Sequence, residues 1–159
     1  MRLSKIEEFL LKLRKRQVLF VGLGNPLRSD DTAGLLIIDR ILEFPLSENW
    51  KAVKCYQTPE NYLDALSKGK HDVIVFIDTV QGIEENYRIY EKEEIRDFSF
   101  STHSFGLASI IDFLNRKKRF EIYLVGLRPA VLSLGTTLSL EMKRIIETIV
   151  KGFERECKK

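Results

Sequence analysis

The sequence VIVFIDT occupies residues 73–79, and its first five residues are all apolar. A run that is apolar on both faces is typical of a strand at the centre of a parallel sheet, where helices cover both sides. On either side of it, shorter apolar runs alternate with amphipathic stretches. We expect further strands at 18–21, 52–56, 87–90 and 122–125, and helices at 32–43, 59–69, 105–114 and 138–153. This alternation predicts an α/β fold with helices on both faces of the sheet.

The composition fits one soluble globular domain. Of the 159 residues, 44% are hydrophobic and 31% are charged. No apolar run approaches the ~20 residues of a membrane-spanning helix, so we expect no membrane partner. The two cysteines, Cys55 and Cys157, provide neither a disulfide scaffold nor paired zinc ligands. This cysteine usage favours a cytoplasmic location.

The basic charge is concentrated at the N-terminus. Residues 1–16 contain six basic and two acidic residues, whereas the rest of the chain has 20 basic and 21 acidic residues. A nearly neutral body argues against a nucleic-acid partner, because phosphate binding needs a concentrated basic surface. We interpret 1–16 as an amphipathic basic helix that packs on a single α/β domain, residues 17–159. Its apolar residues at helical spacing are Leu3, Ile6, Phe9, Leu10 and Leu13.

Polar residues follow three of the expected strands, where parallel sheets gather their ligands. The first strand leads into GLGNPLRSDD (residues 22–31), and the central strand ends in Asp78 and Thr79. His103 lies just before an expected helix. The segment 22–31 has only half of a dinucleotide-binding glycine motif, and its Pro26 and paired acids do not suit a pyrophosphate.

Asp30 and Asp31 are two successive acids at an expected helix start. One of them has a structural explanation, because an aspartate can cap the helix. A second carboxylate beside it is repelled unless a cation is present. Asp78 is the natural further ligand for such a cation, although its carboxylate can also serve only to accept hydrogen bonds from loop amides. One carboxylate of the acidic pair, Asp78 and His103 would together make a three-ligand site with open positions, suited to zinc, nickel, manganese or iron. We interpret the second histidine, His71, as structural.

These residues resemble the hydrogenase maturation endopeptidases, which complete the large subunit of nickel–iron hydrogenases. The motifs that carry the resemblance are VGLGNPLRSDD (21–31) with Gly34, Ile77-Asp78-Thr79, HSFGL (103–107), and more weakly VGLRP (125–129) with Gly135, Leu138 and Ser139. The resemblance implies a three-layer α/β/α sandwich of the phosphorylase/hydrolase-like type with a mostly parallel sheet. It implies that Asp31, Asp78 and His103 are the metal-binding positions, which we also take as the catalytic ones.

The resemblance further implies an aspartyl-type endopeptidase activity that removes a short C-terminal peptide from the nickel-loaded large-subunit precursor. Nickel would arrive with the substrate, and zinc could replace it in vitro; we expect a monomer. The chain departs from the family at Thr32 and Ala33, where glycine is usual, and at Ala130, where an acid is common. The helix of residues 1–16 has no counterpart in typical members. These departures leave open which hydrogenase is the partner.

The sequence contains no clear nucleophile triad, because Ser101 and Ser104 are too close to His103 and neither cysteine has an adjacent base. Asp31, Asp78 and His103 would complete the coordination of a nickel ion that substrate cysteines hold. The ion could then activate water, orient the peptide or only anchor the substrate. Two alternatives are a non-catalytic metal-sensing module of hydrogenase assembly and a peptidyl-tRNA hydrolase. A peptidyl-tRNA hydrolase shares the VGLGNP opening but would require a catalytic histidine soon after it, and this chain has no histidine before His71.

Overall fold

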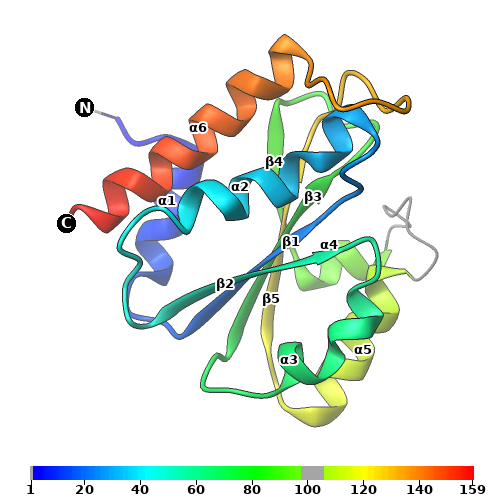
Figure 1. The fold of residues 1–159 in the computed structure, drawn as a ribbon. Coiled ribbons are helices and arrows are strands. Elements are labelled where there is room, and N and C mark those ends of the chain that lie inside the picture. The colour runs from blue at the N-terminus through cyan, green and yellow to red at the C-terminus, as the bar shows by residue number, and fades with distance from the viewer. Residues whose placement is uncertain (1, 98–105) are drawn as a thin grey trace.

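The computed structural model describes residues 2–97 and 106–159 (Figure 1). Its helices are α1 (Lys5–Leu13), α2 (Ala33–Ile41), α3 (Leu63–Ser67), α4 (Lys92–Asp97), α5 (Leu107–Lys117) and α6 (Leu140–Cys157), with 3-10 turns η1 (Ser29–Thr32) and η2 (Pro59–Tyr62). Its strands are β1 (Val18–Leu23), β2 (Trp50–Tyr56), β3 (Val73–Thr79), β4 (Tyr87–Glu91) and β5 (Glu121–Leu127).

The five strands form one sheet in the order β2-β1-β3-β5-β4. β3, the run that is apolar on both faces, lies at the centre, and all seven of its residues are buried. Its neighbours β1 and β5 are parallel to it, and only the edge strand β4 is antiparallel. The predicted mostly parallel sheet is therefore confirmed.

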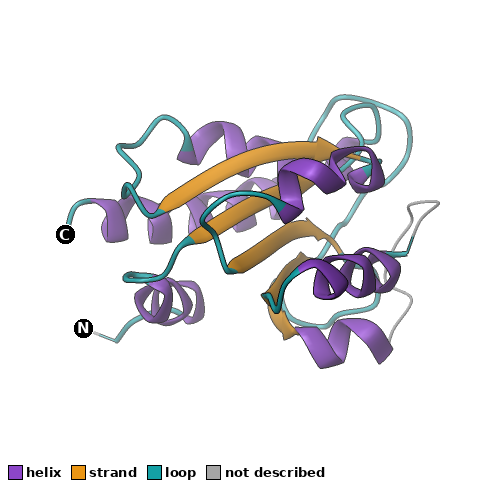
Figure 2. Ribbon diagram, turned by 90° about the horizontal axis from the view of Figure 1, so that it is seen from below, coloured by secondary structure: helices purple, strands orange, loops and turns teal. Residues whose placement is uncertain are grey.

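Helices cover both faces of this sheet (Figure 2). Helices α1, α2 and α6 pack on one face against Phe20, Val75 and their neighbours. Helices α3, α4 and α5 pack on the other, against residues such as Val21 and Phe76. Successive residues of each central strand thus point to different helical layers, which explains why these strands are apolar throughout. The predicted three-layer α/β/α sandwich is confirmed.

Some predicted boundaries differ from the structure. The helix expected at 32–43 begins with the 3-10 turn η1, and the helix expected at 59–69 is divided between η2 and α3. The start of the helix expected at 105–114 lies outside the described residues, and α5 begins at Leu107. Helix α4 was not predicted, because a six-residue helix with the sequence KEEIRD has no amphipathic period.

Two glycines allow α2 to approach the sheet closely. A methyl group on Gly34 would lie 2.4 Å from the carbonyl oxygens of both Leu23 and Ile77. A methyl group on Gly22 would lie 2.7 Å from the carbonyl oxygen of Gly34. The first turn of α2 therefore lies directly on the carboxyl ends of β1 and β3, at a distance that only glycine permits.

We expect Gly34→Ala to lower the free energy of unfolding by about 2 kcal/mol or more, because the clash with two backbone carbonyls outweighs the better helix propensity of alanine. Gly106→Ala is the matched control, since a methyl group there meets no atom of the described residues within 4 Å. Because Gly106 is the N-cap of α5, this change should lower the free energy of unfolding by less than about 1 kcal/mol. Urea unfolding measures both. Equal stability of the two variants would show that α2 can move away from the sheet without loss.

Helix α1 packs on the body of the protein, as predicted. Its residues Ile6, Phe9, Leu10 and Leu13 are buried in the same core as α6, and a methyl group on Gly152 would lie 2.9 Å from Ile6. Leu3, however, precedes the helix and is 37% exposed. Among the described residues, no helix is both long and apolar enough to cross a membrane.

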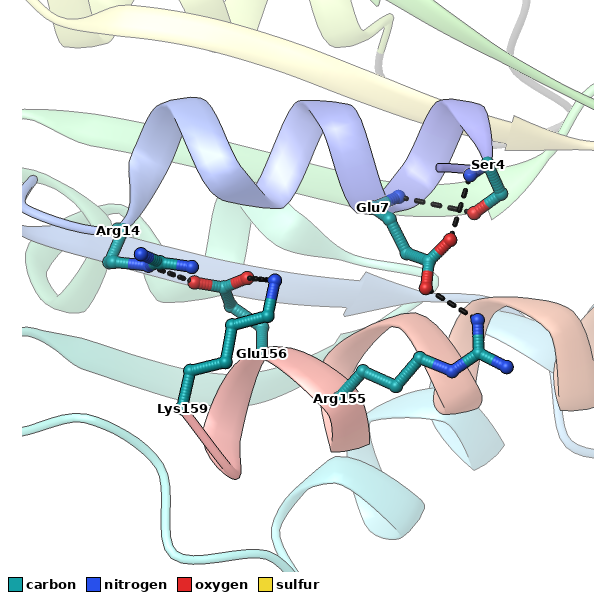
Figure 3. Close-up of polar contacts among 6 residues, drawn as sticks. All are labelled: Ser4, Glu7, Arg14, Arg155, Glu156 and Lys159. Carbon is teal, nitrogen blue, oxygen red and sulfur yellow. Dashed lines mark hydrogen bonds and ion pairs between the residues drawn. The ribbon is translucent and has the colours of Figure 1, made fainter. Parts of the chain in front are cut away.

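Polar contacts tie α1 to the end of the chain (Figure 3). Ser4 and Glu7 form a capping box, and Glu7 also accepts a hydrogen bond of 2.6 Å from Arg155 in α6. At the C-terminal end of α1, Arg14 pairs with Glu156, which also pairs with Lys159. The hydrogen bonds from Arg155 and Ser4 lower the pKa of Glu7 from 4.5 to about 2.

We expect Glu7→Ala to lower the free energy of unfolding by about 2 kcal/mol at neutral pH, because it removes a helix cap and a charge-assisted hydrogen bond. Since the pKa of Glu7 is lower in the folded protein, its contribution is complete above about pH 4.5 and is lost as the pH falls towards 2. Urea unfolding of the variant and the wild type at pH 7 and pH 3 measures this difference.

The matched control is Glu8→Ala, at the exposed neighbouring position. It should match the wild type within ~0.5 kcal/mol at both pH values. A Glu7→Ala deficit that is the same at pH 3 as at pH 7 would contradict the proposed ionic contribution.

Candidate functional site

The candidate site lies where β1, β3 and β5 end, at the carboxyl edge of the sheet. Three segments meet there: the loop 24–31 after β1, the last two residues of β3, and the loop 128–139 between β5 and α6 (Figure 1). The sheet brings them together because the parallel strands β1, β3 and β5 all end on this side.

The loop after β1 folds back on itself so that Asp31 returns to the end of the strand. The N–H of Asn25 donates to both the carbonyl oxygen of Asp31 (3.1 Å) and its Oδ2 (3.2 Å). Gly24 has a φ of +151°, and a methyl group on it would lie 2.1 Å from that same carbonyl oxygen. The glycine of the GLGN motif therefore makes room for the returning acid.

Thr79 joins the two predicted carboxylates. Its hydroxyl donates to Oδ1 of Asp31 at 2.5 Å, and its backbone N–H donates to Oδ1 of Asp78 at 2.8 Å. Asp31 and Asp78 are 4% and 7% exposed, so both carboxylates are largely removed from water. Two acids 47 positions apart in the sequence are thus held by one residue at the sheet edge.

Asp30, the neighbour of Asp31, has a structural role that differs from the predicted one. It does not cap its own helix, since neither η1 nor α2 has a side-chain cap. Its fully buried carboxylate instead accepts hydrogen bonds of 2.7–2.9 Å from the N–H groups of Ala130, Val131 and Ser139 and from the Ser139 hydroxyl. Burial opposes ionisation, but these hydrogen bonds outweigh it and lower the pKa of Asp30.

Backbone hydrogen bonds continue this connection between the two loops. The N–H of Ser29 donates to the carbonyl of Gly135 at 2.8 Å, and the N–H of Gly135 donates to the carbonyl of Leu27 at 2.9 Å. Gly135 has a φ of +150° there, and Ser29 has a φ of +48°. The weaker motif at 125–139 therefore has a physical basis, because Gly135 and Ser139 bind the loop that carries the acids.

Comparisons with known proteins agree with this geometry. The family model of the hydrogenase maturation proteases, HycI, matches residues 34–156, which is most of the chain. The chain belongs to the hydrogenase maturation protease family. The match includes Asp78 and His103 but begins after Asp31. Membership of this family excludes the peptidyl-tRNA hydrolase alternative.

Several relatives match most of the length of the chain. A Methanocaldococcus jannaschii protein, itself named provisionally as a hydrogenase maturation protease, is 24% identical over 94% of this chain and 96% of its own. The crystal structure of the NiFe hydrogenase maturation protease HycI from Thermococcus kodakarensis superposes with a TM-score of 0.83, at 23% identity, covering 98% of this chain and 100% of that one. The Escherichia coli endopeptidase HybD gives a TM-score of 0.74 at 21% identity, over 85% and 88%. These structural likenesses establish the fold.

The structure describes one of the two histidines of this protease, His71. His103, the predicted third ligand, lies outside the described residues, so its place relative to the two carboxylates stays a prediction. His71 lies just before β3, at the opposite edge of the sheet from Asp78. Its Nε2 is 2.7 Å from the carbonyl oxygen of Leu66, its ring stacks on Phe120, and burial lowers its pKa. The structural interpretation of His71 is confirmed.

Neither cysteine of the protease is activated as a nucleophile. Cys55 is fully buried in β2, and burial raises its pKa to about 12. Cys157 ends α6, and burial and the nearby Glu156 raise its pKa as well. Within residues 2–97 and 106–159, no group of three histidine, cysteine or acidic side chains is placed to hold a metal. The described part of the site is therefore the pair Asp31 and Asp78 with Thr79.

We expect Asp30→Ala to destabilise the protein far more than Asp31→Ala. The first change removes a fully buried carboxylate that accepts hydrogen bonds from the N–H groups of Ala130, Val131 and Ser139. The loss of these charge-assisted hydrogen bonds should lower the free energy of unfolding by about 3 kcal/mol. Asp31→Ala removes a carboxylate that lies beside a second one, and the relief of repulsion should limit the loss to about 1 kcal/mol. Urea unfolding at neutral pH measures both. A larger loss for Asp31→Ala would show that the two acids have the opposite roles.

Proposed function

We propose that this protein is an endopeptidase that removes a short C-terminal peptide from the nickel-loaded large-subunit precursor of a nickel–iron hydrogenase. The observation that carries the proposal is the pair of buried carboxylates, Asp31 and Asp78, bound to Thr79 at the carboxyl edge of the sheet. The chain's membership of the hydrogenase maturation protease family supports the type of reaction.

The chemistry of the carboxylates fits a substrate-borne divalent ion. Carboxylate oxygens bind borderline divalent metals, and an imidazole from His103 would make the set suitable for nickel, or for zinc in vitro. Three ligands leave coordination positions that cysteine thiolates of the precursor would occupy. In that position nickel would lower the pKa of a bound water or polarise the scissile carbonyl.

The chain's own residues have two tasks in this proposal. Thr79 fixes the orientation of Asp31 and Asp78 through its hydroxyl and its N–H, so that the ligands need little reorganisation when the ion arrives. Asp30 keeps the loop 128–139 next to them. Recognition of nickel would then ensure that only a metal-loaded precursor is cut.

A mass-spectrometric cleavage assay on matched nickel-loaded and nickel-free precursors tests the proposal. The wild type should shorten only the loaded form, even at high protease concentration. The reason is that a nickel-free precursor offers its cysteine thiolates but no cation for the carboxylates to bind. Asp78→Ala and His103→Ala should reduce cleavage of the loaded form at least ~100-fold, whereas Asp31→Glu should retain part of it. The control Asp64→Ala changes an exposed aspartate on α3 and should cleave normally.

Equal cleavage of the two precursors would reject nickel-dependent recognition. If the wild type binds the loaded precursor in calorimetry but never shortens it, the non-catalytic metal-sensing module becomes the better description. If it neither binds nor shortens the precursor, both functions are wrong.

A further inference from the structure

Exposed apolar side chains gather at the edge of the sheet that carries the acids. Eight large apolar residues of the described chain are exposed, and five of them lie at or beside the carboxyl ends of β1, β2 and β5 or at the start of α6. These five are Leu27, Tyr56, Val131, Leu134 and Leu140. Leu134 is 75% exposed and Leu27 is 61% exposed. Such a concentration on one edge indicates a contact surface.

Three of these residues belong to the two loops that hydrogen bonds hold together. The carbonyl of Leu27 accepts from Gly135, next to Leu134, at 2.9 Å. Val131 exchanges two hydrogen bonds with Asp30, through its carbonyl (3.0 Å) and its N–H (2.9 Å). The side chains of Leu27, Val131 and Leu134 thus extend from a fixed backbone, so little conformational freedom would be lost when a partner covers them.

The same hydrogen bonds place these side chains next to the candidate site. Val131 binds Asp30 directly, and Asp30 precedes Asp31 in one turn of 3-10 helix. A peptide bound at Asp31 and Asp78 would therefore lie close to these loops. A second copy of the chain seated on the same side chains would obstruct the site, so a substrate segment is the occupant that fits best.

We propose that Leu27, Val131 and Leu134 are specificity-determining residues, which contact an apolar, extended segment of the precursor next to the cleavage site. The inference rests on the proposed function. The acids would recognise the metal-bearing end of the substrate, while the apolar side chains would select the residues that flank it. Discrimination among precursors would then depend on the loop 128–139 together with Leu27.

Steady-state cleavage of the nickel-loaded precursor tests this assignment. Leu134→Ser and Val131→Thr should each raise KM by about tenfold, because buried apolar contact is lost, and should leave kcat within about twofold. Leu134→Met, which keeps an apolar side chain of similar size, should retain a nearly normal KM. The matched control is Leu42→Ser, a 52% exposed leucine just after α2, at the opposite edge of the sheet. It should leave both constants unchanged.

The outcomes separate this inference from the proposed function. If the wild type cleaves the precursor and both substitutions leave KM unchanged, the specificity role is wrong and the function stands. A fall in kcat with an unchanged KM would also overturn it. If sedimentation shows that the wild type self-associates and Leu134→Ser does not, the surface is an interface between copies. A wild type that neither cleaves nor binds the precursor would reject the function and the inference together.

Discussion

The candidate site depends on the close backbone contact between α2 and the ends of β1 and β3. Because Gly34 has no side chain, the first turn of α2 lies against the carbonyl groups of Leu23 and Ile77. The preceding turn then brings Asp31 within hydrogen-bond distance of the Thr79 hydroxyl. A side chain at position 34 would move the helix start outward and separate the acid from β3. In the proposed role of Asp31 as a metal ligand, such a shift would prevent binding, because ligand distances vary by only ~0.2 Å.

The fold followed from the sequence more readily than the site did. The apolar run at 73–77 predicted the central strand, and the alternation around it predicted the layers, because burial on both faces requires apolar residues at every position. The sequence also placed Asp31 in the loop after the first strand and Asp78 at the end of the central strand. It did not reveal that Thr79 binds both acids, although a hydroxyl residue directly after a strand-terminal aspartate is a signal that could have suggested it.

The role of Asp30 could not be predicted, because its partners are about a hundred positions away. Local rules assign an aspartate at a helix start to capping, and only the folded chain shows that the loop 128–139 supplies its donors instead. Helix α4 was missed for a related reason: its one buried apolar residue, Ile95, is recognised as such only when the sheet lies beside it. The place of His103 stays a prediction from the motif.

The hydrogen bonds of Asp30 also determine when the site can form during synthesis. Its acceptor oxygens meet Val131 and Ser139 only after those residues have been made, 101 and 109 positions later in the chain. Contacts over such separations form late, because they need the intervening strands to be paired first. A ribosome-bound chain that ends before β5 would therefore lack the loop 128–139, which binds Asp30 beside the acid pair. The candidate site would therefore be complete in the nascent protein only after its last third had been translated and folded.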